Sequence, residues 1–380
     1  MTPKPLEVIE EHFGQVKDPR KDRTKQHMLV DILVIAICAI ICGAEGWVDI
    51  ELYGNSKLTW LKTFLALPHG IPSHDTFGRV FSMIDAQQFQ LAFYEWVLAV
   101  NEIIRGQIIN IDGKCLRGSD DQKLGKRAIY MVSAWATENE IVLGQRKVDE
   151  KSNEITAIPE LLKMLAISGC IVTIDAMGTQ TNNAKTIVEA HADYILSVKE
   201  NQGHLFEDIS TLFAVDQAQN FKYASFEYKK TISKGHGRID IRECWSTSSP
   251  AYLSLIRGVE NWIGLHSVSM IINTRSIGDK ETKQVRYYIS CLPSNAEKIL
   301  RAVRKHWSIE NKLHWVLDVA LNEDHSRVRK DQAPENLAVL RHIALNLLKH
   351  EKTAKGGIHA KQLQAGWKED YQLKVLASGV

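Results

Sequence analysis

Hydrophobic and polar positions divide the chain into stretches with different periodicity. Before residue 105, apolar residues recur at helical spacing. Residues 25–42 become apolar all round, as in a buried helix, while Phe89, Phe93 and Trp96 mark one face of residues 86–104. Ser73 precedes another candidate helix, whose first N–H groups its hydroxyl can cap. The pattern therefore predicts a helical domain over residues 1–104.

Residues 105–215 alternate short apolar runs with amphipathic segments. Strands are predicted at 107–111, 128–135, 141–148, 170–174 and 193–199, and helices at 154–165 and 179–192. The first three strands can pair as a meander, and the later ones, joined by crossover helices, add in parallel. The expected fold class is therefore α/β, with the mixed sheet and strand order of an RNase H-like core.

Strand-like runs without helical periodicity follow in residues 216–292. They lie at 226–232, 238–245, 267–273 and 286–292, and they predict a β-rich insertion in the core. Helical spacing returns over 295–321 and 334–349. Residues 293–350 are thus expected to complete the core, and residues 351–380 to form a C-terminal tail.

Charge and composition narrow the classes of function. The 47 Lys and Arg residues nearly balance the 45 Asp and Glu residues, so any contact with nucleic acid would use local basic patches. The apolar run at 29–42 is shorter than the roughly 20 residues of a bilayer span. The six cysteines include no Cys-x-x-Cys pair, and the N-terminus lacks a secretion signal. We expect a cytoplasmic protein with no membrane partner.

Two aspartates follow strands that the predicted order makes neighbours. Asp112 ends the first core strand and Asp175 ends the fourth, so both carboxylates should project from the carboxyl edge of the sheet. Like charges that close repel unless a cation lies between them, and Mg²⁺ prefers oxygen ligands. The alternative for each residue is structural, because Asp-Gly is a common turn pair and strand-end aspartates often cap the next segment.

A third acid, Glu310, lies in a helix expected to pack on the same edge. His306, Glu310 and His314 are spaced at i, i+4 and i+8, so they share one helical face. Glu310 is the predicted third metal ligand. It could instead pair with Lys305 or Arg304 on an exposed helix. A zinc site is a weaker alternative, because the helical His-Glu-x-x-His motif is absent.

Side chains near these acids, together with the charged stretch 17–27, are candidates to contact DNA. They are Lys114, Arg117, Lys199, Asn201, His236, Arg238, His306, Trp307, His314, Trp315, Arg20, Lys21 and Arg23. For the basic loops the alternative is simple solvation. For the two tryptophans it is packing in a helical core rather than stacking on an unpaired base.

The sequence also resembles insertion-sequence transposases of the DDE class, in particular the ISAs-type group with the H-repeat-associated, Rhs-linked proteins. The resemblance runs nearly end to end. It is carried by DPRKDRTKQHMLVDILVIAICAIICGAEGW, GIPSHDTFGRVF, NIDGKCLRG, KVDEKSNEITAIPELL, VTIDAMG, LSVKENQG, KGHGRID, RYYISCLP and HWSIENKLHWVLDVALNEDHSR.

This resemblance implies Asp112, Asp175 and Glu310 as catalytic acids that hold Mg²⁺ or Mn²⁺, with two ions. It implies cleavage at transposon ends and strand transfer into target DNA, by a homodimer or higher synaptic complex bound to terminal repeats. The chain departs from related transposases in one respect: His306 stands where they place an arginine, and no lysine follows Glu310 at the expected distance. A metal-dependent nuclease without strand transfer and a catalytically silent DNA-binding remnant are the alternatives, with a metal-dependent phosphatase third.

Overall fold

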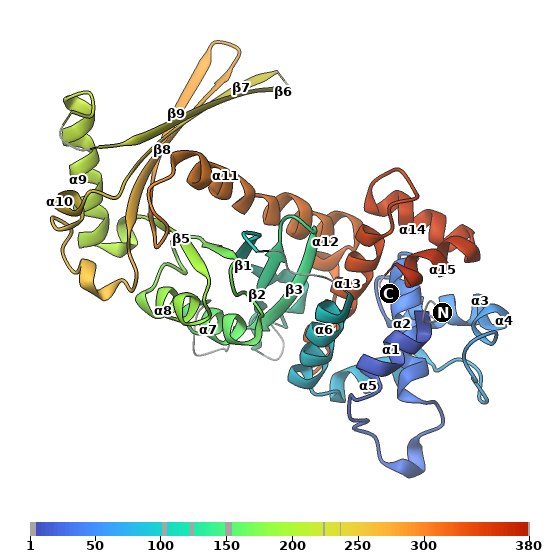
Figure 1. Ribbon diagram of the computed structural model, residues 1–380. Coiled ribbons are helices and arrows are strands. Elements are labelled where there is room, and N and C mark those ends of the chain that lie inside the picture. The colour runs from blue at the N-terminus through green and yellow to red at the C-terminus, as the bar shows by residue number, and fades with distance from the viewer. Residues whose placement is uncertain are drawn as a thin grey trace.

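A nine-stranded mixed sheet flanked by helices adjoins a region made of helices alone (Figure 1). This computed structural model describes residues 5–100, 105–121, 125–148, 154–222, 225–235 and 237–378. The predicted α/β class with an N-terminal helical region is confirmed.

The N-terminal helices follow the predicted pattern with shifted ends. Their bounds are α1 Pro5–Phe13, α2 Leu29–Ile41, α3 Trp47–Ser56, α4 Leu58–Leu61, α5 His74–Met83 and α6 Ala86–Val100. Helix α2 is buried on every side, as its continuous apolar run predicts. It begins at Leu29 rather than at residue 25, because Met28, directly before it, has an extended backbone with φ −66° and ψ 145°. The Ser73 hydroxyl caps α5 by accepting the N–H of Thr76.

The first five strands have the predicted order and directions. They are β1 Ile108–Leu116, β2 Ile129–Ala136, β3 Ile141–Lys147, β4 Ile171–Ile174 and β5 Asp193–Val198. Strand β1 pairs antiparallel with β2 and parallel with β4, and β5 continues the parallel side. The sheet order is β3-β2-β1-β4-β5-β9-β8-β7-β6, so strands one and four are neighbours.

The predicted β-rich insertion extends this same sheet. Strand β9 pairs antiparallel with β5, and β8, β7 and β6 follow outward. The bounds are β6 Glu227–Gly235, β7 Arg238–Thr247, β8 Ser267–Ile277 and β9 Lys280–Ser290. Helices α9 His204–Ala218 and α10 Pro250–Leu253 cover one end. The β8–β9 hairpin is longer than predicted, because its outer half is polar and exposed and so lacks the apolar pattern of a buried strand.

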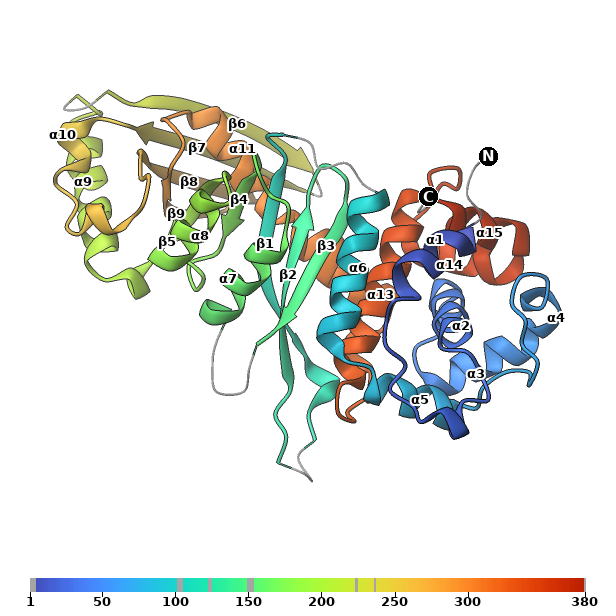
Figure 2. The ribbon, with the colours of Figure 1, turned by 60° about the horizontal axis from the view of Figure 1, so that its bottom comes forward.

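Helices cover both faces of the sheet. Helix α11, Ala296–His306, packs on one face, and α7 Glu154–Met164 and α8 Thr181–Glu189 pack on the other (Figure 2). The two faces have separate hydrophobic clusters, with Ile109 and Ile111 in one and Ile108 with α11 in the other. Because strand side chains alternate, Asn110 and Asp112 lie on the α11 face.

The chain ends in helices that join the N-terminal helical region. Helix α13, Ala333–His350, packs against α2, α5, α6 and β3, and α14 Ile358–Trp367 and α15 Glu369–Ala377 pack against α2. Residues 358–377, expected within a tail, are therefore helical. Side-chain contacts hold them: Gln372 donates to the Cys38 carbonyl at 3.0 Å, and Lys57 pairs with Glu369 at 3.1 Å. Among the described residues, no helix combines the length and apolar character needed to cross a bilayer.

Candidate active site

Three adjacent strands present the same kind of series on the α11 face. Each runs from isoleucine through a small polar residue to a charged one: Ile108, Asn110, Asp112; Ile171, Thr173, Asp175; and Ile195, Ser197, Lys199. Strand β1 continues to Leu116, so the expectation that Asp112 ends the strand is wrong, as is the alternative of an Asp-Gly turn. Asp112 lies instead just past the last β1–β4 pair, Ile111 with Ile174, where the two strands separate.

The three acids expected from distant parts of the chain line one cavity. It has a volume of about 120 Å³, and Asp112, Asp175 and Glu310 all contribute to its wall. Lys199, Arg286, His306 and Trp307 line the same cavity. Strands β1 and β4 and the segment after α11 supply the carboxylates, and the end of β5 and strand β9 supply the basic groups Lys199 and Arg286.

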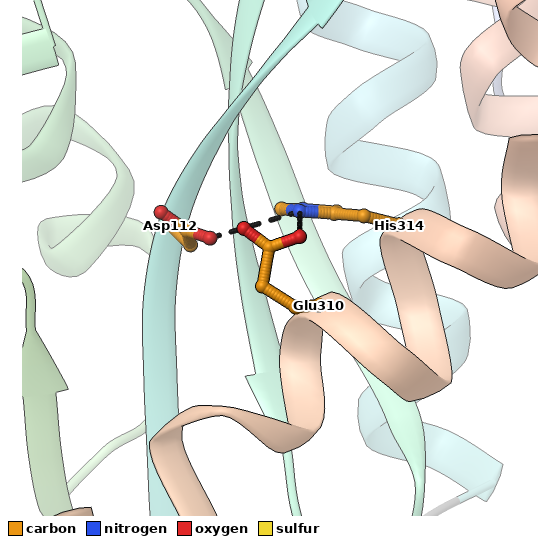
Figure 3. A group of neighbouring side chains, drawn as sticks. All are labelled: Asp112, Glu310 and His314. Carbon is orange, nitrogen blue, oxygen red and sulfur yellow. Dashed lines mark ion pairs between the residues drawn. The ribbon is translucent and has the colours of Figure 1, made fainter. Parts of the chain in front are cut away.

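Asp112, Glu310 and His314 form the tightest group in this region (Figure 3). Their potential ligand atoms all lie within 4.8 Å of one another. His314 Nδ1 is 3.5 Å from Glu310 Oε2 and 3.6 Å from Asp112 Oδ2. Asp175 lies outside this group, and its Oδ1 accepts the N–H groups of Met177 and Gly178 in a tight turn.

The helix expected over 295–321 is interrupted at this site. After α11, residues Glu310–His314 form a π-helical turn, and α12 follows at Trp315–Ala320. Such turns are rare and concentrate at functional sites. His306 and Glu310 still line one cavity and His314 still approaches Glu310, so the predicted shared face is retained across the break.

A buried polar network fixes the end of α11 to the two acid-bearing strands. Asn110 Nδ2 donates to the Lys305 carbonyl at 2.9 Å, and Thr173 Oγ1 donates to Asn110 Oδ1 at 2.8 Å. His306 Nδ1 lies 2.9 Å from Thr173 Oγ1. Because the Thr173 proton is committed to Asn110, His306 donates from Nδ1. Asn110 and Thr173 precede Asp112 and Asp175 by two residues, so this network holds both acids against the helix.

Burial and mutual repulsion dominate the electrostatics of the cavity. Burial raises the pKa of Asp112 to about 7, and the Glu310 and Asp175 carboxylates act in the same direction while His314 opposes them. A hydrogen bond with His314 lowers the pKa of Glu310. Burial lowers the pKa of His306 to about 4, so this imidazole is neutral at pH 7. Clustered carboxylates of this kind fit a divalent cation with oxygen ligands, and the imidazole of His314 adds a nitrogen donor.

Comparison with known proteins identifies the family. A family model described as "Transposase DDE domain" matches residues 104–347, and one described as "DDE_Tnp_1-associated" matches residues 10–97. The chain belongs to the DDE transposase family. The resemblance drawn from the sequence motifs is thereby confirmed.

Relatives with matching length support this assignment. The chain is 41% identical over 376 residues to "H repeat-associated putative transposase YhhI" of Escherichia coli K12, covering 98% of each chain. It is 40% identical to "Putative transposase YncI" of Escherichia coli O157:H7, covering 98% of this chain and 95% of the relative. A shorter relative named "Inactive transposase YbfQ" matches 20% of this chain at 46% identity.

Two basic residues that were expected to contact DNA in this family member have structural partners instead. The Lys114 side chain is only 10% exposed and pairs with Asp318, Glu323 and Asp324 at 2.6 to 3.1 Å. Arg20 is buried and pairs with Asp18 at 2.8 Å. Neither location suits a phosphate contact. The sequence pattern could not show this, because the carboxylates around Lys114 come from residues some 200 positions later.

The other expected DNA contacts differ in exposure. Arg117, Lys199, Lys21, Arg23 and Asn201 are exposed, and the Asn201 amide donates to the Ala176 carbonyl at 2.9 Å. Arg238 lines a large cavity beside the acids, and His236 lies outside the described residues. His314 is only 5% exposed, so it faces the acids rather than solvent.

Both tryptophans of the Glu310 segment lie at the surface. Trp307 is 45% exposed and Trp315 is 60% exposed, so the alternative that they pack in a helical core is wrong. Trp307 also lines the acidic cavity.

Glu154 is a further acid at this site, and the sequence alone assigned it no role. Its carboxylate lies against Gly113: a Cβ atom at that glycine would come within 2.1 Å of Glu154 Oε1. Burial raises the pKa of Glu154, with a further contribution from Asp175. Gly113 was the available signal in the sequence that another group lies close to this strand, because glycine in a strand often marks the close approach of another group.

Proposed function

We propose that this protein is a DDE transposase that cleaves phosphodiester bonds at the ends of its element and transfers the freed strand into target DNA. The observation that carries the proposal is the convergence of Asp112, Asp175 and Glu310 on one cavity. Membership of the DDE family and the core strand order 3-2-1-4-5 support it, and we assign the core to the RNase H-like fold.

In this proposal the carboxylates of Asp112, Asp175 and Glu310 hold two divalent cations, Mg²⁺ or Mn²⁺, and His314 is positioned to assist. When bound, such ions would stabilise charge on the attacking and leaving oxygens of an in-line displacement. Water attacks first at the transposon end, and the freed 3′-hydroxyl then attacks target DNA. Lys199 and Arg286, on the cavity wall, would hold the phosphate, and neutral His306 would position the helix through Thr173.

Family membership and the exposed basic residues together are the basis for the binding partners that we propose. We assign recognition of the terminal repeats to residues 1–104, with Lys21 and Arg23 exposed there, and catalysis to residues 105–350. We also propose a homodimer or higher synaptic complex, which is the assembly that the sequence resemblance implies. Residues 351–380 would stabilise the N-terminal region on which their helices pack.

The test is cleavage of labelled element-end DNA with Mg²⁺ or Mn²⁺, followed on a sequencing gel. Asp112→Asn, Asp175→Asn and Glu310→Gln should each lower cleavage at least ~10³-fold and leave DNA affinity unchanged, because the ligands act on the reacting phosphate. Asp279→Asn, an exposed aspartate in the β8–β9 turn, is the matched control. Cleavage at the wild-type rate by any acid variant removes that residue from the site.

The same assay separates the competing functions. Joined products with target DNA indicate strand transfer, whereas cleavage without joining indicates a nuclease. DNA binding by the wild-type protein without any cleavage indicates a catalytically silent remnant.

A further inference from the structure

A second and larger cavity adjoins the acidic one. It has a volume of about 600 Å³ and lies between the outer strands and α11. Five arginines line it, from three strands and the helix: Arg238, Arg242, Arg275, Arg286 and Arg304. None of its lining residues is acidic. We call it the arginine cleft.

One buried carboxylate organises three of these arginines. Asp240 lies 2.7 Å from Arg275, 3.3 Å from Arg242 and 3.4 Å from Arg238. Within the described ranges, Arg286 and Arg304 form no ion pair with a carboxylate. Five guanidinium groups therefore share one acid, and the cleft carries a strong excess of positive charge that calls for an anionic ligand.

The cleft is continuous with the catalytic cavity. Arg286, Tyr288 and Trp307 line both. The Arg286 guanidinium lies 4.6 Å from the centre of the Trp307 ring, and that ring remains partly exposed. A chain of phosphates and bases could therefore run from the acids into the cleft, with phosphates on arginine and bases near aromatic rings.

We propose that the arginine cleft binds a short single-stranded segment of DNA that leads away from the scissile phosphate. The proposal rests on the proposed function, because it places the cleft on the path of that substrate. The cleft has the volume of a small-ligand pocket, about 300–1,000 Å³, which is too small to enclose a duplex. A basic groove with aromatic side chains is the general arrangement for binding unpaired nucleotides, and guanidinium groups hold phosphates with two hydrogen bonds.

The test measures the affinity of the full chain for labelled oligothymidylate and for a duplex of equal length, by fluorescence anisotropy in EDTA. The variant is Arg286→Gln with Arg304→Gln, since neither change leaves a buried carboxylate without its partner. The control is Arg301→Gln, which removes one arginine charge from α11 outside the cleft. Arg304→Lys keeps the charge, and thermal melting checks that each variant folds.

We expect wild type to bind the single strand more tightly than the duplex, and the double variant to lose roughly 10- to 100-fold of that affinity. The slope of log affinity against log salt should fall by about 0.7 for each arginine removed. The Arg301→Gln control should bind as wild type does, and Arg304→Lys should lie between.

Equal affinity of the double variant and wild type for oligothymidylate would overturn the proposal. So would equal binding of duplex and single strand with equal losses, which would make the cleft a duplex contact. Failure of the proposed function is distinguishable: if wild type never cleaves end DNA but the cleft variants lose single-strand binding, the cleft assignment stands and the transposase activity falls.

Discussion

The two halves of the sheet present opposite chemistry on the same face. Under α11, strand β1 carries Ile108, Asn110 and Asp112 at alternate positions, whereas β8 carries Ile271, Asn273 and Arg275. Both series begin with an isoleucine in the same hydrophobic cluster as α11. The inner series ends in the acidic cavity and the outer one in the arginine cleft.

The difference shows how one scaffold separates chemistry from substrate binding. An aspartate side chain is short, so the backbone fixes the position of its carboxylate. Asp112 and Asp175 therefore occupy fixed positions where β1 and β4 separate. Arginine is long and flexible, and the buried Asp240 supplies the orientation that the backbone does not. The predictions below test this separation, from the largest expected effect to the smallest.

Asp175→Asn should lose mainly cleavage rate, whereas Arg304→Gln should lose mainly affinity for single-stranded DNA. Asp175→Asn should lower cleavage at least ~10³-fold and change single-strand affinity by less than about twofold, because only the acidic half acts on the reacting phosphate. Arg304→Gln should lower affinity several-fold, and saturating DNA should restore most of its cleavage rate. Single-turnover kinetics at varied DNA concentration measures both. If both variants lost cleavage rate and DNA affinity in proportion, the acidic cavity and the arginine cleft would not have separate roles.

Mn²⁺ should stabilise the protein through the acidic half alone. At a concentration 100-fold above its Kd, a bound ion contributes about 2.7 kcal/mol to the free energy of unfolding and raises Tm. Asp112→Asn should abolish most of the rise and Arg304→Gln should retain it. Differential scanning fluorimetry with and without EDTA is the measurement. A full Mn²⁺ shift in Asp112→Asn would place the ion elsewhere.

Thr173→Val should separate positioning from ligation. The change keeps the shape but removes the hydroxyl that links Asn110 to His306, so α11 and Glu310 lose their fixed place over the strands. Cleavage should fall roughly 10- to 100-fold, as small misplacements of reacting groups do, while the Kd for oligothymidylate stays unchanged. Thr173→Ser should restore activity. If Thr173→Val and Thr173→Ser behave alike, the hydrogen bonds do not position the site.

The two aspartates should give stability profiles of opposite slope with pH. The folded pKa of Asp112, about 7, lies above its ordinary value of 3.8, so its favourable contribution is present below pH 3.8 and is lost as pH rises toward 7. Asp112→Asn should therefore stabilise the protein increasingly over that interval. A hydrogen bond from Arg275 lowers the pKa of Asp240, so its contribution is present above pH 3.8 and is lost as pH falls through the lowered value.

Asp240→Asn should accordingly destabilise the protein at pH 7, with the loss shrinking in acid. For Asp112 the rise in pKa from 3.8 to about 7 corresponds to at most about 4 kcal/mol in the free energy of unfolding at pH 7. Urea titrations from pH 3 to pH 8 measure both differences. Profiles of the same sign would show that the two halves do not differ in electrostatic environment.

The inner half of the sheet could be predicted from the hydrophobic pattern along the chain. The core strands are buried on both faces, so Ile108–Ile111, Ile171–Ile174 and Tyr194–Val198 are apolar runs that stand out from their surroundings. Asp112 and Asp175 follow the paired part of these runs, which is why their convergence was predictable. Glu310 followed from helical spacing with His306 and His314, although the π turn between them carried no signal.

Pairings between distant segments were decided only by the tertiary structure. No local pattern shows that β9 adds to β5, that Asp318, Glu323 and Asp324 enclose Lys114, or that α14 and α15 pack beside α2. The arginine cleft is of the same kind, since its five arginines come from β7, β8, β9 and α11.

The sequence by itself therefore determined the secondary structure of the core, the acids at its edge and the family. The fold alone decided which charges meet and which are buried. The physical reason is range: periodicity reports the environment within one helix or strand, whereas ion pairing and burial depend on side chains brought together from elsewhere in the chain.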